Sequence, residues 1–483
     1  MSDFKIKIIK SVKWNSINTL LTTIISPLTL VILARLLSPI EFGYISIITI
    51  ILGISKTISE MGFSQGIIKE EEICSKDLSS IFWFEVFLGF FVFSIVFFSS
   101  GIIAGFFNEV ELTYLIRYTA LVFLIEPFSL VFKALLEKEI KYKQLQIANI
   151  VRLIITNGIK IALAILGFGA FSVVYANIIA AFFFATALFT MFTKNKLWLP
   201  ELCFSIERVK PYLKFGIFIS AKSILHTFSK RIDEILIGRV LGSELLGLYY
   251  FAKNIITRLY ILISNPISQL AFPLLAKYRS DQIRFKDVFI KITGYLAAIG
   301  IPAFVGVALT SQYFVPLVFG DIWIEATPIL VILSAWGAVK SIEHNMPSRA
   351  LYCFGKSDYV FYLSFLDLII RLLIMFMAAL HSIELMAFTF FAVEFLKYIA
   401  WIIILKRLSS ITLLSIWQKV NRYILYSLFM AIFLYIFSIN IYITNLVNLI
   451  INILMGIMIY LICFYIFSRK DFQDIMGNIV LLK

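Results

Sequence analysis

Basic residues inside long apolar segments are the groups of this sequence with the clearest chemical use. A lysine or arginine near the centre of a membrane-spanning helix costs roughly 2.5 to 3.5 kcal/mol to insert, so it needs a partner, water or a function. In a hydrated cavity such a group can hold a phosphate or another anion that crosses the membrane. The candidate anion-binding residues are Lys56, Lys160, Lys222, Lys230, Arg231, Arg258, Lys340 and Arg371.

Acidic residues at comparable depth are fewer, which leaves an excess of positive charge within the apolar segments. They are Glu60, Glu85, Glu126, Asp233, Glu234, Glu343, Asp367 and Glu394. Some lie three or four residues from a base and can form ion pairs within one helix, as in Lys56–Glu60, Arg231–Glu234, Asp367–Arg371 and Glu394–Lys397. For Lys160, Lys222, Lys230, Arg258 and Lys340 we expect partners on other helices or on a substrate, which makes them the better cavity candidates.

Uncharged polar residues form a stripe on the first apolar segment. Spacings of three and four place them on one helical face, which comprises Asn18, Thr22, Ser26 and Thr29. The corresponding face of the seventh segment carries Lys222, His226, Lys230 and Asp233. Because a polar face in lipid is costly, both stripes are expected to line one shared cavity.

The elements that position these residues must be membrane-spanning helices. The 483 residues are 61% apolar and 16% aromatic, with a mean hydropathy of +0.95, and a soluble chain of this length cannot bury so much. About fourteen apolar runs are long enough to span a bilayer. The runs are continuous in Ile, Leu and Phe, whereas the strands of a membrane β-barrel alternate in polarity. We therefore predict an all-α integral membrane protein with about 14 transmembrane helices.

The distribution of basic residues predicts the topology. The net charge of +14 is concentrated at the N-terminus and in every second polar break, while breaks such as "FNEVEL" and "GFGAF" contain no Lys or Arg. The positive-inside rule then places both termini in the cytoplasm and the chain in the cytoplasmic membrane. Because the basic loops are the orientation signal, they do not indicate nucleic acid as a partner. The basic start leads into a full span without a cleavage site, so no removable signal peptide is expected.

An internal repeat divides the predicted bundle. A shift of 204 residues aligns "ARLLSPIEFGY" with "GRVLGSELLGL", so that Arg35 matches Arg239 and Gly43 matches Gly247. Spans one and seven both run outward, which makes the repeat parallel and predicts two six-helix lobes around a central cavity. The expected domains are an N-lobe at 1–200, a C-lobe at 201–409, and two appended helices with a tail at 410–483. Arg35 ends a span at this corner, and its expected role is mainly structural.

The sequence offers little for catalysis or for a cofactor. The four cysteines and three histidines show no metal-ligand spacing, and no disulfide is expected. No phosphate-binding loop of the GxxxxGK[ST] type is present. Loops predicted to face outward are short and lack Lys and Arg. We therefore predict a non-enzymatic protein without metal or cofactor, coupled at most to a proton or sodium gradient.

Several segments in register resemble a known transporter family. They include "LARLLSPIEFGYISI", "SEMGFSQGIIKEEE", "FSKRIDEILIGRVLGSELLGLYYFAKNI" and "VPLVFGDIWIEATPIL". The chain is similar in these segments to polysaccharide transporters of the Wzx, TuaB and colanic-acid-exporter type, within the multidrug/oligosaccharidyl-lipid/polysaccharide superfamily. The resemblance implies a flippase that moves an undecaprenyl-diphosphate-linked oligosaccharide to the outer leaflet by alternating access. It also implies a polysaccharide polymerase and a chain-length regulator as partners in surface polysaccharide biosynthesis.

Two other functions remain open at this point. An ion-coupled multidrug antiporter would use acidic residues to bind cations, and Asp233 and Glu60 are its best support, although the basic excess argues against it. A membrane-embedded glycan polymerase, ligase or glycosyltransferase would need a sizeable loop with acidic, His or Arg residues near the surface. The short outward loops leave little room for such an enzyme.

Overall fold

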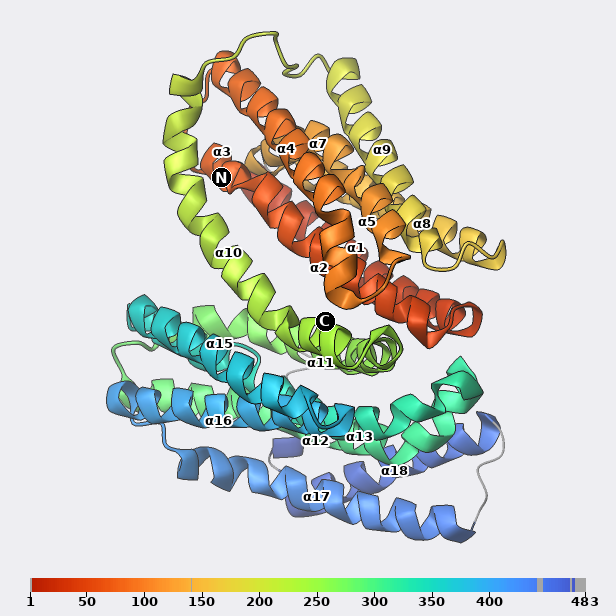
Figure 1. Cartoon of the computed structure of the whole chain (residues 1–483). Helices are drawn as coiled ribbons and strands as arrows, with labels where there is room; N and C mark the ends of the chain where they lie inside the picture. Colours follow the sequence, from red (N-terminus) through yellow and green to blue (C-terminus); the bar gives the residue numbers. More distant parts are fainter. Residues whose placement is uncertain (1, 140, 441–445, 470, 474–483) are drawn as a thin grey trace. The chain divides into compact units, whose positions relative to one another are not determined.

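The computed structural model describes residues 2–139, 141–440, 446–469 and 471–473, and within these ranges the chain is helical without any strand (Figure 1). The helices form two compact units, residues 1–247 and 248–483. The first unit comprises α1 (Ser2–Leu36), α2 (Pro39–Glu60), α3 (Phe63–Lys69), α4 (Ser75–Phe107), α5 (Leu112–Ala120), α6 (Val122–Ile125), α7 (Pro127–Lys138), α8 (Tyr142–Ile165), α9 (Phe171–Lys194) and α10 (Ile206–Val240).

The second unit begins within α11 (Ser243–Lys277). It continues with α12 (Gln282–Phe314), the short helices η1 (Val315–Phe319) and η2 (Asp321–Ala326), α13 (Thr327–Glu343), α14 (Met346–Cys353), α15 (Ser357–Ala379), α16 (Ile383–Ser409), α17 (Leu413–Asn440) and α18 (Leu446–Phe467). The lobe boundaries expected from the repeat remain a prediction.

The number of membrane spans agrees with the sequence. Among the described residues, twelve helices are long and apolar enough to cross a membrane, and the pair Leu112–Ile125 and Pro127–Lys138, bent by 47°, supplies a thirteenth. The 35-residue helix α10 carries several charged residues and is not among these candidates, so the described residues supply twelve or thirteen spans where the sequence predicts about fourteen. The predicted all-helical, multi-pass membrane fold is confirmed.

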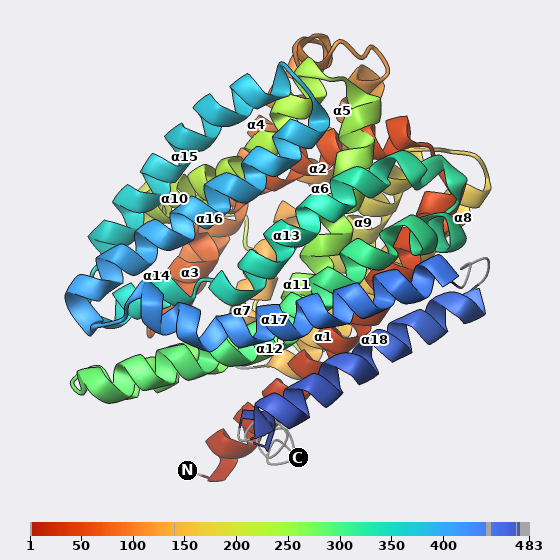
Figure 2. The ribbon, with the colours of Figure 1, turned by 90° about the horizontal axis from the view of Figure 1, so that it is seen from below.

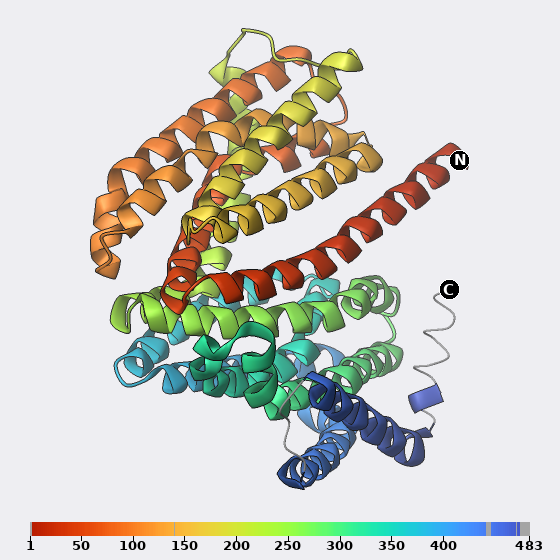
Figure 3. The ribbon, with the colours of Figure 1, turned by 90° about the vertical axis from the view of Figure 1, so that its right-hand side faces the viewer.

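In the first unit, apolar side chains from α3, α4, α7 and α9 form a continuous core around Phe63, Phe82 and Phe132. Helix α1 runs beside α8, red and gold in Figure 3. Helix α10 packs against α2, α3 and α4. These packings bury the carboxylates of Asp233 and Glu234 on α10 inside the unit.

In the second unit, α12 is the central helix, because α13, α17 and α18 all pack against it (Figure 2). Its core includes Phe285, Phe289, Trp401 and Tyr423. The appended helices α17 and α18 lie side by side, and the Tyr460 hydroxyl of α18 donates a 2.7 Å hydrogen bond to the Ala298 carbonyl of α12. The charged helices α15 and α16 pack against each other, and α16 also contacts α13.

The repeated corner after α1 is a capping box. Ser38 is the N-cap of α2, Pro39 follows in the first turn, and the Glu41 carboxylate accepts hydrogen bonds from the Ser38 backbone N–H at 2.7 Å and from its hydroxyl at 3.0 Å. Such reciprocal bonds satisfy amide groups that have no partner within the helix. The corner is therefore fixed locally, and the sequence signal that encodes it is Ser-x-x-Glu.

The two copies of this corner meet each other within the first unit. A Cβ atom on Gly43 would collide with the Ser243 carbonyl, and one on Gly247 would collide with the Pro39 carbonyl. Pro39 and Gly43 are 204 residues before Ser243 and Gly247, so the contact is reciprocal and follows the internal repeat. Only glycine allows two backbones to come this close.

Small residues continue this close packing along α2 and α10. A Cβ on Gly53 would lie 3.5 Å from Thr227 Cγ2, and one on Gly62 would lie 2.9 Å from the Gly216 Cα. Residue numbers rise along α2 as they fall along α10, so the two helices run antiparallel over their whole length. Small residues at such crossings are typical of tight helix pairs in membranes.

Candidate functional site

The first unit contains a charge cluster built from four helical segments, which we call the N-cluster. Lys56 of α2 lies 2.6 Å from the Glu126 carboxylate and 3.9 Å from Glu60, and Arg152 of α8 lies 3.1 Å from Glu126. The Arg152 guanidinium also lies 4.9 Å from the centre of the Phe184 ring. Lys56 thus pairs more closely with Glu126, on another helix, than with the neighbour expected within its own helix.

A second set of polar contacts joins α10 to α2. The Arg231 guanidinium donates to both carboxylate oxygens of Glu234 at 2.9 and 2.8 Å, which confirms the ion pair expected from their spacing. Glu234 is fully buried and also accepts a 2.8 Å hydrogen bond from the Ser46 hydroxyl. Asp233, next to it, is fully buried as well. These contacts hold Arg231 against the α2–α10 crossing.

The second unit contains a larger cluster centred on Glu394 of α16, which we call the C-cluster. Glu394 is 3% exposed and pairs with Lys340 of α13 at 2.6 Å, with Arg371 of α15 and with Lys397 of its own helix. Asp367 lies 2.9 Å from Arg371, and Glu343 lies 2.5 Å from Lys340. Lys340 therefore has one partner within its own helix, Glu343, whereas we expected its partner on another helix or on a substrate. The Asp367–Arg371 and Glu394–Lys397 pairs are confirmed.

Both clusters place a carboxylate at a break in a span. Glu126 directly precedes Pro127, the first residue of α7, and Glu343 is the last residue of α13, just before α14. Each carboxylate binds a lysine of the same cluster, at 2.6 and 2.5 Å. Within each cluster the charges balance, so the excess of bases inferred from the sequence is largely neutralised at these positions. Buried ion pairs of this kind fix helix positions more than they add stability.

The remaining basic candidates lie outside these clusters. Arg258 of α11 is half-buried, and its Nε atom is buried without a hydrogen-bond partner among the described residues. Lys160 of α8 is half-buried, and Lys230 of α10 is exposed. The side chain of Lys222 lies outside the described residues. An unsatisfied guanidinium N–H is costly, which makes Arg258 the strongest of these candidates for an anionic ligand.

The polar stripe of α1 contacts α8 in the N-terminal half of the helix. The Asn18 side-chain amide donates a 2.7 Å hydrogen bond to Gln146 of α8. The Thr22 and Thr29 hydroxyls donate to carbonyls of their own helix at 2.8 and 2.9 Å, and Ser26 is half-buried. His226 on α10 is exposed. A central cavity lined by these residues remains a prediction.

The partners that buried acidic residues find on other helices could not be predicted from the sequence. Glu126 and Glu394 each collect several bases from different helices, and Glu85 is 1% exposed without a hydrogen-bond partner for either oxygen among the described residues. The sequence signal was available, because a carboxylate in an apolar span is as costly as a base. Spacing, however, pairs Glu394 only with Lys397 and predicts no partner for Glu126 or Glu85.

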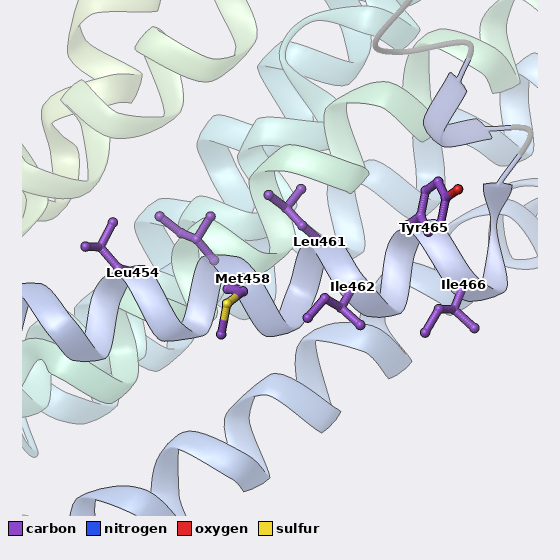
Figure 4. A pocket seen from close by; sticks show the side chains of 7 residues that line it. Leu454, Met458, Leu461, Ile462, Tyr465 and Ile466 are labelled. Atoms are coloured by element: carbon purple, nitrogen blue, oxygen red, sulfur yellow. The ribbon is translucent and has the colours of Figure 1, made fainter.

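One shallow apolar hollow lies on α18 (Figure 4). Its lining comes from this single helix and consists of Leu454, Ile457, Met458, Leu461, Ile462, Tyr465 and Ile466. A row of exposed aliphatic side chains on one helix is typical of a lipid-facing surface, and it offers no group that would bind a charged headgroup.

Comparisons with known proteins agree with this architecture. The family described as "Polysaccharide biosynthesis protein" matches residues 32–328. "Teichuronic acid biosynthesis protein TuaB" of Bacillus subtilis (strain 168) is 27% identical over 358 residues, which cover 74% of this chain and 73% of that protein. "Lipopolysaccharide biosynthesis protein WzxC" of Escherichia coli (strain K12) is 28% identical over 342 residues, or 71% of this chain and 69% of that protein. The resemblance inferred from short motifs is confirmed.

The fold also has a counterpart among solved structures. "Lipid II flippase MurJ, inward closed conformation" superimposes with a TM-score of 0.77 at 16% sequence identity, covering 94% of this chain and 98% of that chain. At this identity the likeness establishes the shared fold. At this coverage it includes residues of both compact units.

Proposed function

Because the chain belongs to the polysaccharide biosynthesis protein family, we propose that it is a flippase for an undecaprenyl-diphosphate-linked oligosaccharide. It moves this lipid-linked glycan across the cytoplasmic membrane by alternating access and supplies the synthesis of a surface polysaccharide. Both chain termini lie in the cytoplasm. A polysaccharide polymerase and a chain-length regulator act on the glycan afterwards as partners.

The observation that carries this proposal is the family match over residues 32–328, which includes the repeated corner, the N-cluster and Arg258. The relatives' names place them in the biosynthesis of teichuronic acid and lipopolysaccharide. The buried bases fit a substrate with an anionic diphosphate, and the exposed aliphatic faces of the helices fit a substrate whose isoprenoid tail stays in lipid. Transport of this kind needs no covalent chemistry, so the protein is not an enzyme.

Arg258 is the residue that we assign to the diphosphate. Its guanidinium keeps a donor without a protein partner among the described residues, whereas Lys56, Arg231, Lys340 and Arg371 are engaged by carboxylates. A guanidinium matches the geometry of phosphate oxygens and stays charged at all physiological pH values. Lys160, Lys222 and Lys230 are the further bases that would contact the substrate.

Replacing Arg258 by glutamine should slow transport of the lipid-linked glycan. Loss of charge-assisted hydrogen bonds worth about 1.5 to 3 kcal/mol corresponds to a roughly 10- to 100-fold lower rate. The measurement is the initial rate at which a labelled undecaprenyl-diphosphate oligosaccharide reaches the outer leaflet of proteoliposomes. Arg258→Lys keeps the charge and should retain part of the rate.

The matched control is Arg284→Gln, which removes an exposed arginine at the start of α12 and should leave transport unchanged. If Arg258→Gln transports at the wild-type rate with normal expression, Arg258 does not hold the diphosphate. If the triple variant Lys222→Gln, Lys230→Gln, Arg258→Gln is equally active, the cationic transport path itself is wrong. Transport of drug-like cations in place of the glycan would favour the antiporter alternative.

A further inference from the structure

Glu85 is a buried carboxyl group that the proposed transport path does not use. It lies on α4, is 1% exposed, and has no hydrogen-bond partner for either side-chain oxygen among the described residues. The other buried glutamates of the first unit, Glu126 and Glu234, each bind an arginine. An ionised carboxylate without such partners is very unfavourable in an apolar interior, and a buried acid in this situation takes up a proton instead.

Two charged residues of neighbouring helices interact with Glu85. Among the described residues these are Glu60 of α2, which has the same charge as an ionised Glu85, and Lys133 of α7, which has the opposite charge. Helices α5, α6 and α10 also pack against α4, and their described residues contribute no charge there. The protonated and the ionised form of Glu85 therefore each have one compatible charged neighbour. Its protonated form is compatible with Glu60, and its ionised form is compatible with Lys133.

Helix α4 also touches the bend that carries the N-cluster. Gly89, one turn after Glu85 on the same face, lies so close to the α6–α7 segment that a Cβ on it would collide with Pro127 and with the Phe123 carbonyl. Glu126 sits between these two residues of the bend and binds both Lys56 and Arg152. Glu60 in turn lies 3.9 Å from Lys56. A change of charge at Glu85 therefore acts on the helices that carry the N-cluster.

We propose that Glu85 is a proton-binding site that couples transport to the proton gradient. In one conformation its carboxyl group carries the proton. In the other, the proton leaves to water and the carboxylate faces Lys133 as α4 and α7 shift at the bend. One proton moves inward as the glycan moves outward. This inference rests on the proposed function, although the protonation of Glu85 can be measured without transport.

Infrared spectroscopy of the purified protein tests the protonation directly. The wild type should show the carbonyl band of a buried, protonated carboxylic acid at neutral pH, and Glu85→Gln should lose this band. Glu111→Gln, which changes an exposed glutamate of the same unit, should keep it. If the Glu85→Gln and wild-type spectra agree in this region, Glu85 does not hold a proton and the proposal is wrong.

Transport in proteoliposomes tests the coupling. An inward proton gradient should raise the initial rate of glycan transport several-fold in the wild type and have no effect in Glu85→Gln, which mimics the protonated acid. Glu85→Asp can still titrate and should retain a gradient response even if its rate falls. A gradient response in Glu85→Gln, or wild-type transport that ignores the gradient, would overturn the coupling. If the wild type transports no glycan while the infrared band is present, the proposed function fails but the protonation site stands.

Discussion

Replacing Glu394 by alanine is expected to be the most destabilising single substitution in the chain. Glu394 is the shared partner of Lys340, Arg371 and Lys397, and it is 3% exposed, so its removal leaves three cations near one another in a buried place. Removing one partner of a buried ion pair costs roughly 3 to 5 kcal/mol. Lys340 keeps Glu343 and Arg371 keeps Asp367, but all three bases lose their shared partner at once, so we expect the upper end of this range. Thermal unfolding of the detergent-solubilised protein measures the effect as a lower midpoint.

The matched control is Arg284→Ala, which removes one partner of the exposed Arg284–Asp281 pair, leaves the Asp281 cap of α12 in place and should change the midpoint little. A second variant tests the cause. Adding Lys397→Met to Glu394→Ala removes one of the stranded cations and should recover part of the lost stability. Equal midpoints for Glu394→Ala and Arg284→Ala would show that the C-cluster does not hold α13, α15 and α16 together.

Cross-linking α2 to α10 in mid-membrane is expected to have the largest effect on transport. A Cβ on Gly53 would lie 3.5 Å from Thr227 Cγ2, so cysteines at both positions can be joined by oxidation or by a short thiol cross-linker. Span two belongs to one predicted lobe and span seven to the other, and alternating access requires the lobes to separate at each face in turn. The joined variant should therefore lose essentially all glycan transport and regain it on reduction.

The single variants Gly53→Cys and Thr227→Cys should transport with and without oxidant, which excludes an effect of the native cysteines. A cross-linked double variant that still transports would contradict a mechanism in which α2 and α10 move apart. It would favour motion elsewhere in the bundle, for instance at the 47° bend between α6 and α7.

The membrane-spanning helices could be predicted from the sequence because the residues that determine each helix lie within its own segment. A bilayer demands about 20 apolar residues per span, and this requirement is met within each segment. The hardest helix was α10, whose charged residues reduce its apolar character below that of the other spans. The internal repeat aligns it with α1. The orientation of the chain in the membrane rests on the positive-inside rule and stays a prediction.

The candidate site could be predicted only where its contacts are local. The pairs Arg231–Glu234, Asp367–Arg371 and Glu394–Lys397 follow from spacings of three or four residues. The contacts of Glu126 with Arg152 and of Glu394 with Lys340 join residues that are 26 and 54 apart in the chain, and no periodicity encodes them. Several bases that have no predicted partner on another helix are therefore bound by carboxylates. The remaining bases are the ones that the transport assays above test.

The reciprocal contact of the two corners has a consequence for how this sequence can evolve. Gly43 accommodates the Ser243 carbonyl, and Gly247 accommodates the Pro39 carbonyl, so each copy of the predicted repeat provides the space that the other copy fills. A side chain added at either glycine disturbs the same junction. The two halves could diverge freely along most of their lengths, but at these positions they inherited one constraint in common. In related sequences, paired retention of glycine at both corners would therefore mark descent from a duplicated ancestor even where the rest of the repeat has become unrecognisable.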